Sequence, residues 1–203
     1  MSAEKDGWDI PEKNIPDPAT EPRTLVPALQ QPGRYPLIDY DPHISRVIRY
    51  MRPSDVAVFA ACSIGAPSAL WALEKGWPTF NTRGSFMRVM RLTGAIGITA
   101  GFLLATTRSS LRFYGHSENA REIEMDMREM TDKVKRGEPL YGESRLSEYM
   151  QGMAHRNSRY SAIMSFWFPM FNFVNHPYHG VDTAKYYQNA ERELEAERKA
   201  RQG

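Results

Sequence analysis

Residues Met87–Arg108 read MRVMRLTGAIGITAGFLLATTR, and this stretch decides how the rest of the chain is interpreted. The part from Leu92 to Thr107 is uncharged and mostly apolar, and arginines lie at both ends. Extended back to Phe86, the stretch reaches the ~20 residues that a bilayer core requires, and its own arginines would then lie near one interface. It therefore predicts a membrane-spanning helix, with a buried helix of a soluble domain as the alternative.

Three glycines within this stretch predict how the helix packs. Gly94, Gly97 and Gly101 advance by three and four residues, so they share one stripe of the helix. In lipid, small residues let a second helix approach closely, whereas three glycines in a soluble helix would cost ~2–3 kcal/mol relative to alanine. We expect Gly94, Gly97 and Gly101 to form a helix-packing interface.

A second apolar run, Ser54–Leu73, reads SDVAVFAACSIGAPSALWAL and carries one charge, Asp55, at its start. Pro53, Ser54 and Asp55 are typical of the first turn of a helix. A short loop with turn residues joins this run to the next one. The predicted fold class is mainly α, with a two-helix transmembrane hairpin (54–73 and 87–107) that places both chain ends on one side of the membrane.

The segment before the hairpin, residues 1–53, contains nine of the fourteen prolines. Because proline interrupts helices and ladders, we expect an extended Pro-rich N-terminal arm that ends in a short amphipathic helix after Asp41. Spaced apolar side chains along the arm favour contact with another protein's surface over a floppy tail. These anchors are Trp8, Ile10, Leu25, Val26, Leu29, Tyr35, Leu37, Ile38 and Tyr40.

The segment after the hairpin, residues 109–203, is predicted to form a peripheral region with amphipathic or polar helices. One helix runs from a cap at Ser117 to Gly137, and its mixed charges indicate a solvated face. A polar helix covers Asp182–Gln202, with a thin apolar seam of Ala184, Tyr187, Ala190 and Leu194. Between them, an aromatic stretch is interpreted as an apolar docking surface. Its residues are Phe166, Trp167, Phe168 and Phe171.

The search for chemistry yields no predicted catalytic, cofactor-binding or metal residue. Nucleotide, zinc-protease and paired-cysteine motifs are missing, and the single cysteine, Cys62, lies inside the first span. His176 and His179 are three residues apart, but Pro177 opposes a helix there and no acidic residue is close in sequence before Asp182. A net charge of +2 does not suggest nucleic-acid binding. The acidic first 22 residues lack the pattern of a presequence, so an import signal would be internal.

Several segments together resemble a known family. They are YPLIDYDPH at Tyr35–His43, VIRYMRPSD at Val47–Asp55, the hairpin as far as Gly115, and the region Ser158–His179. This pattern is similar to the fungal 21 kDa accessory subunit of mitochondrial respiratory complex I, NADH:ubiquinone oxidoreductase.

The resemblance implies a non-catalytic accessory subunit of the membrane arm in the mitochondrial inner membrane. Such a chain would carry no cofactor and would contribute to assembly and stability, not to electron transport itself. Its implied partners are phospholipids and the other membrane-arm subunits of this hetero-oligomeric respiratory-chain complex.

Two other functional classes stay open from the residues alone. One is a membrane-shaping or lipid-organising hairpin protein, and the other is a small membrane enzyme that acts on lipid. For orientation, a weak positive-inside bias predicts both termini on the matrix side. The termini side carries Arg46, Arg49, Arg52, Arg108, Arg112 and Arg121, against Lys75, Arg83, Arg88 and Arg91 on the loop side.

Overall fold

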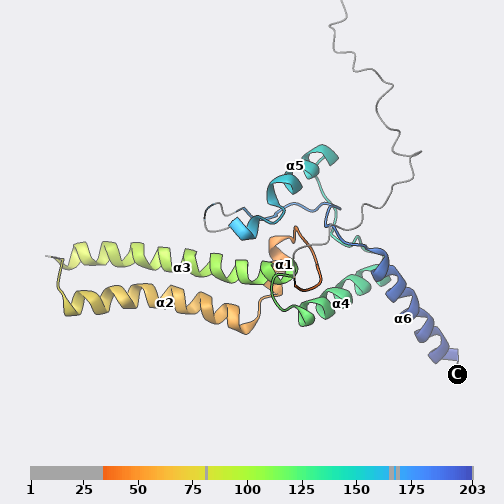
Figure 1. Cartoon of the computed structure of the whole chain (residues 1–203), viewed down its shortest axis with the longest axis horizontal. Coiled ribbons are helices and arrows are strands. Elements are labelled where there is room, and N and C mark those ends of the chain that lie inside the picture. The colour runs from red at the N-terminus through yellow and green to blue at the C-terminus, as the bar shows by residue number, and fades with distance from the viewer. Residues whose placement is uncertain (1–33, 81, 165–166, 168–169, 203) are drawn as a thin grey trace, which may run out of the picture. The chain divides into compact units, whose positions relative to one another are not determined.

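The computed structural model describes residues 34–80, 82–164, 167 and 170–202, and this part of the chain is mainly helical, as predicted. Figure 1 labels the helices in chain order. They are α1 (Ile44–Arg49), α2 (Pro53–Gly76), α3 (Arg83–Phe113), α4 (Ala120–Arg136), α5 (Glu148–Ser158), the 3₁₀ turn η2 (Ser161–Met164) and α6 (Ala184–Gln202). The predictions for residues 1–33, and for Phe166 and Phe168, lie outside the described residues.

The predicted hairpin is formed by α2 and α3, which run side by side along their lengths (Figure 1). Both helices are long and apolar enough to cross a membrane. At about 1.5 Å per residue, the 24 residues of α2 extend ~36 Å and the 31 residues of α3 extend ~46 Å. Asp55 is the one buried residue of α2. The apolar side chains of this helix point outward, as lipid-facing side chains do.

Both helices are longer than the predicted spans, most clearly at the end of α3. That helix was expected to stop at Thr107 but continues through Phe113. The added residues are buried against the segments outside the hairpin, with Ser109 1% and Phe113 0% exposed. Tertiary contacts therefore extend the helix beyond the apolar run that marks the span.

Two of the three stripe glycines lie against α2. A Cβ atom added at Gly97 would sit 2.7 Å from the carbonyl oxygen of Cys62, and one at Gly101 would sit 2.8 Å from that of Phe59. Gly94 has open space beside it. The close approach at Gly97 and Gly101 is therefore made within the hairpin, between the backbones of its two helices.

The amphipathic helix predicted after the hairpin is α4, and its polar face differs from the prediction. Ser117 does not cap it, because Asn119 occupies the cap position. The expectation that its charges form a solvated face is wrong for Glu122 and Asp126, which are 0% and 3% exposed. These carboxylates are buried because arginines from other segments reach them.

The predicted polar helix near the end is α6, which packs on α4. Of the seam predicted for it, Ala190 is buried, while Tyr187 and Leu194 are 50% and 37% exposed. Tyr186 is fully buried in their place, together with Met130 of α4. The contact face is thus rotated toward Tyr186, whose hydroxyl bonds to a buried carboxylate of α4.

The region between α4 and α6 contains a helix that the sequence did not indicate, α5, followed by η2. After η2 the chain returns to the start of α1, where His43 and Asn172 form an isolated parallel bridge. Ile44 donates its backbone N–H to the carbonyl oxygen of Asn172 over 2.9 Å. This return brings the C-terminal region beside the segment that precedes the hairpin.

The glycine contacts predict a measurable difference between positions of one stripe. Gly101→Leu should separate α2 from α3 and lose packing of ~1–3 kcal/mol, because overpacked contacts must shift. Gly94→Leu adds the same side chain in open space and is the matched control. The readout is the rate at which a maleimide labels Cys62, the single cysteine, in the full chain in mild detergent. We expect faster labelling in Gly101→Leu only, and equal rates in both variants would contradict the close contact.

Candidate functional site: a buried ionic junction

Charged side chains from four parts of the chain converge where the hairpin ends, and we call this cluster the ionic junction. These parts are the segment Ile38–Arg52, the adjoining ends of α2 and α3, α4 and the region Glu148–His179, and α6 adds the hydroxyl of Tyr186. Its acidic members are Asp39, Asp41, Asp55, Glu122, Asp126 and Glu129, and its basic members are Arg46, Arg52, Arg108, Arg112, His155, His176 and His179.

The first part of the junction ties the two spans together. Asp55, in the first turn of α2, is 0% exposed. Arg108 of α3 donates from Nε to Asp55 over 3.1 Å, and Arg112 donates to both carboxylate oxygens. The backbone N–H of Arg52 also donates to this carboxylate over 2.9 Å. A buried carboxylate is tolerated only when it is paired and hydrogen-bonded, so Asp55 fixes α3 beside the start of α2.

The same arginines connect the hairpin to α4. Glu122 is 0% exposed and accepts two hydrogen bonds from Arg52, at 2.7 Å from Nε and 2.5 Å from Nη2. Nε of Arg112 lies 3.4 Å from Oε1 of Glu122, the oxygen that also accepts from Nε of Arg52. Bidentate pairing by a planar guanidinium fixes orientation as well as distance. Glu122 therefore fixes the orientation of α4 relative to α2 and α3.

Arg46 of α1 forms the second part of the junction and is 5% exposed. It donates to Asp39 over 3.1 Å and to Asp126 of α4 over 2.5 Å. Burial alone would lower the pKa of Arg46, but the two carboxylates raise it above its already high value, so the guanidinium stays charged. Its cationic carbon also lies 5.5 Å from the centre of the Tyr50 ring, within cation–π range.

Two tyrosine hydroxyls complete this part of the junction. Tyr186 of α6 donates to Asp126 over 2.5 Å, and Tyr50 donates to Glu129 over 2.8 Å. Burial raises the pKa of Glu129, but Arg46, the Tyr50 hydroxyl and Lys133 together hold it below its usual value. A lowered carboxyl pKa stabilises the fold above the pKa of the unfolded group, and this contribution is lost as the pH falls through the folded pKa.

The third part of the junction contains the histidines. Three side chains converge on Oδ2 of Asp41, which is 1% exposed. They are the hydroxyl of Ser158 at 2.7 Å, Nε2 of His176 at 2.9 Å and Nδ1 of His155 at 3.4 Å. Asp41, His155 and His176 also have the spacing of a small metal site. Their hydrogen-bond partners decide between a metal site and a hydrogen-bonded cluster.

Those partners favour a hydrogen-bonded cluster over a metal site. The backbone N–H of Tyr178 donates to Nδ1 of His176, while Nε2 of this ring lies 2.9 Å from Asp41 and 3.1 Å from Nδ2 of Asn172. A histidine that binds metal through Nε2 needs a proton on Nδ1, and there it would face the N–H of Tyr178. Burial lowers the pKa of His155, so this ring is neutral and donates from Nδ1 to Asp41.

His179 is held between two oxygen acceptors. Its Nδ1 lies 2.8 Å from Asp39, and its Nε2 lies 2.7 Å from the carbonyl oxygen of His176. The two ring nitrogens therefore contact two different oxygen atoms, and Asp39 contacts His179 as well as Arg46. The ring stacks on Tyr141 with a centroid distance of 3.6 Å. Next to it, Gly180 has φ +68° and lies so close to the ring of Tyr40 that a Cβ atom would overlap it.

The sequence reasoning missed this cluster because it looked for acidic partners near His176 and His179 in the chain. The acids that reach them, Asp41 and Asp39, lie more than 130 residues earlier. Of the predicted docking residues that the structure describes, Trp167 is 79% exposed and Phe171 contacts α3. Among the described residues, none of the predicted packing or docking residues belongs to the junction. A partial signal for the junction was available, since Glu122, Asp126 and Glu129 recur with helical spacing.

Comparison with known proteins gives two family matches, which cover different parts of the chain. Residues 32–118 match the family model described as the 21 kDa subunit of NADH-ubiquinone oxidoreductase complex I. Residues 127–202 match the model for the C-terminal part of the same 21 kDa subunit. The first region contains Asp39, Asp41 and Asp55, and the second contains His155, His176 and His179. The histidine part of the junction is thus formed between the two matched regions, and Glu122 and Asp126 lie in the short stretch that separates them.

A curated relative agrees with both matches. The NADH-ubiquinone oxidoreductase 20.9 kDa subunit of Neurospora crassa is 59% identical over 164 residues. This alignment covers 81% of the present chain and 87% of the relative. Similarity at this level extends over the hairpin and the peripheral helices together.

The junction predicts that buried and exposed arginines differ sharply in their effect on stability. Arg46→Met removes the charge that balances Asp39 and Asp126 and should cost ~3–5 kcal/mol in the free energy of unfolding. Arg128→Met removes an exposed pair with Glu124 and should cost less than ~1 kcal/mol. Denaturant titration of the full chain in mild detergent, followed by near-ultraviolet circular dichroism, measures both values. Equal losses would show that the Arg46 pairs are not stabilising.

Proposed function

Because this chain belongs to the family of 21 kDa subunits of NADH-ubiquinone oxidoreductase, complex I, we propose that it is a non-catalytic accessory subunit of the membrane arm of that complex. Its role is to support assembly and stability of the mitochondrial enzyme. The observation that carries this proposal is the ionic junction, in which mostly buried charges of four segments pair with one another and a tyrosine of α6 joins them. The apolar hairpin and the peripheral helices are thereby held in one fixed arrangement.

A subunit that stabilises a larger complex needs a defined shape more than a reactive group. Buried ion pairs add little net stability compared with apolar packing, but a half-paired arrangement is strongly disfavoured. The junction therefore selects a single geometry in which α4 is held by Glu122 and α6 by the Tyr186–Asp126 bond. This geometry lets the chain bridge the lipid-embedded part of a complex and its aqueous part.

The chemistry of the junction also supports a non-catalytic role. The carboxylates at its centre are already engaged by arginine, tyrosine, serine or histidine within the same chain. A general base or a proton carrier needs a free lone pair directed at a substrate or a water-filled path. At Asp41, the most contacted carboxylate, one oxygen receives three side chains at 2.7–3.4 Å.

We propose the division of the chain and its orientation on the same basis. Residues 1–53 form the arm and its short helix, residues 54–108 the membrane hairpin, and residues 109–203 the peripheral region. The ionic junction would lie at the matrix surface, where Arg108 and Arg112 mark the end of the apolar spans. Phospholipids and other membrane-arm subunits would surround the hairpin.

The assembly role predicts a loss of complex without a loss of turnover. In mitochondria that carry Arg46→Met, the amount of intact complex I on native gels should fall several-fold, because the ion pair between α1 and Asp126 of α4 is lost. The NADH:ubiquinone turnover of each assembled complex should stay at the parental value. Arg128→Met is the control and should leave both quantities unchanged. A normal amount of complex with reduced turnover would instead indicate a catalytic contribution.

The orientation predicts the outcome of a protease experiment. Protease added to intact mitoplasts should spare epitope tags at either terminus, because both would lie in the matrix. The loop between α2 and α3 faces the opposite side, and a cleavage site introduced after Trp77 should be cut under the same conditions. Loss of a terminal tag before the membrane is opened would reverse the orientation.

A further inference from the structure

The surface that neither the hairpin contact nor the junction explains lies between α5 and the chain that follows η2. Large apolar side chains are exposed there together, and we call them the apolar rim. Its members are the exposed Ile163, Met170 and Phe173, together with the half-buried Phe171. Phe173 is 68%, Ile163 52% and Met170 50% exposed. Contiguous apolar exposure of this kind marks an interaction surface.

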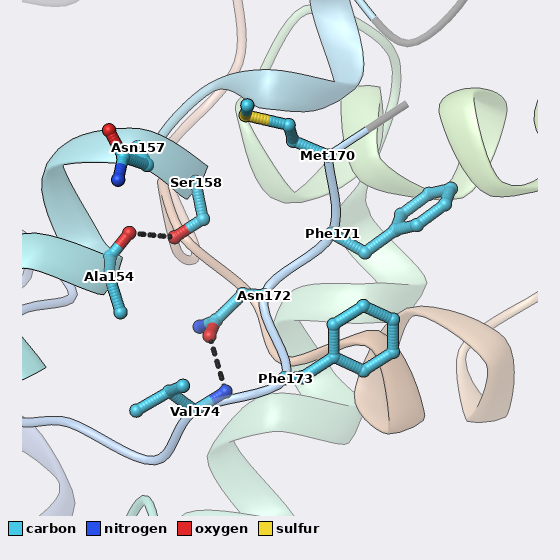
Figure 2. A pocket seen from close by; sticks show the side chains of 8 residues that line it. All are labelled: Ala154, Asn157, Ser158, Met170, Phe171, Asn172, Phe173 and Val174. Atoms are coloured by element: carbon cyan, nitrogen blue, oxygen red, sulfur yellow. Dashed lines mark hydrogen bonds between the residues drawn. The ribbon is translucent and has the colours of Figure 1, made fainter. Parts of the chain in front are cut away.

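A hollow of about 300 Å³ opens beside the rim and is shown in Figure 2. Ala154, Asn157 and Ser158 of α5 form one wall, and Met170–Val174 form the other. Most of the lining side chains are apolar, and the two buried polar ones are already bonded: Ser158 donates to the carbonyl oxygen of Ala154, and Asn172 accepts from the N–H of Val174. The hollow therefore fits an alkyl chain better than a polar ligand.

The position of the rim along the hairpin identifies the alkyl chain. The ring of Phe171 meets that of Phe102 edge-on, with a centroid distance of 5.9 Å. Phe102 precedes Arg108 by six residues, which is ~9 Å along a helix. Since Arg108 pairs with Asp55 at the end of the spans, Phe171 contacts α3 within its apolar part. Figure 1 likewise shows η2 beside α3, with which it is in contact.

The backbone near the rim is suited to the edge of a bilayer. In hydrocarbon, carbonyl groups without partners are too costly for irregular chain to be exposed. Here the carbonyl oxygen of Met170 accepts from the Ser161 hydroxyl over 2.6 Å, and that of Asn172 accepts from Ile44 over 2.9 Å. These bonds satisfy two carbonyl groups of the segment that carries the apolar side chains.

We infer that the apolar rim and the adjoining hollow bind a phospholipid acyl chain at the edge of the membrane, continuous with the lipid-facing surface of α3. This inference rests on the proposed placement of α2 and α3 in the bilayer. It adds a specific lipid site formed by the peripheral region, so that this region contacts the bilayer directly. A protein subunit covering the rim is the competing outcome.

The test places a photoreactive residue at the rim in the full chain within the assembled complex. Phe173→p-benzoylphenylalanine is irradiated in mitochondria, the complex is isolated on a native gel, and the mass of the chain is measured. We expect the mass increase of one phospholipid. A covalent adduct with another protein, or no adduct at all, would overturn the inference.

Matched positions separate failure of this inference from failure of the membrane placement. The same residue at Ile64 of α2 and at Ile96 of α3, which are 66% and 57% exposed, reports lipid contact of the spans. The same residue at Glu124, on the exposed face of α4, should give no lipid adduct. Lipid adducts at Ile64 or Ile96 but not at Phe173 reject the lipid site alone. Lipid adducts at none of the three positions reject the placement of the hairpin and the lipid site together.

Discussion

The carboxylate of Asp55 imposes the constraint on which the remaining arrangement depends. It lies in the first turn of a membrane helix and is fully buried, so its charge must be neutralised within the protein. Arg108 and Arg112 supply that charge only if α3 extends past the apolar span and ends beside the start of α2. Arg112 then faces Glu122 as well, and the need to pair this second buried acid draws α4 to the same place.

Local signals account for the parts of the fold that could be predicted from the sequence. Two apolar runs indicated α2 and α3, and apolar residues at helical spacing indicated α4. The ends were less well predicted, because α3 is prolonged by tertiary burial at Phe113 and Asn119 takes the cap position expected for Ser117. Helix α5 was missed, since its mixed polar sequence has no clear apolar face and its contacts are supplied by distant segments.

The ionic junction could not be predicted for a different reason. Ion pairs between distant segments produce no periodic pattern in the sequence. Asp39 and His179 are separated by 140 residues, and Arg46 and Asp126 by 80. Surface acids and buried acids look alike in a sequence, and the usual expectation that charges on an amphipathic helix are solvated failed at Glu122 and Asp126. The histidines were judged by their neighbours in the chain, whereas their partners come from the segment before the hairpin.

Internal pairing also determines what the chain presents to its surroundings. Because the junction uses its buried charges on itself, the surfaces left around the hairpin are apolar: the outward side chains of α2 and α3, and the rim that continues from them. The two matched family regions meet inside the junction, so neither the segment with Asp39 and Asp41 nor the segment with His176 and His179 satisfies its charges alone. In the function proposed here, such a chain would keep its shape through ion pairs and make its outside contacts through apolar area. That division is the one expected of a subunit whose neighbours are lipid and the apolar surfaces of other membrane proteins.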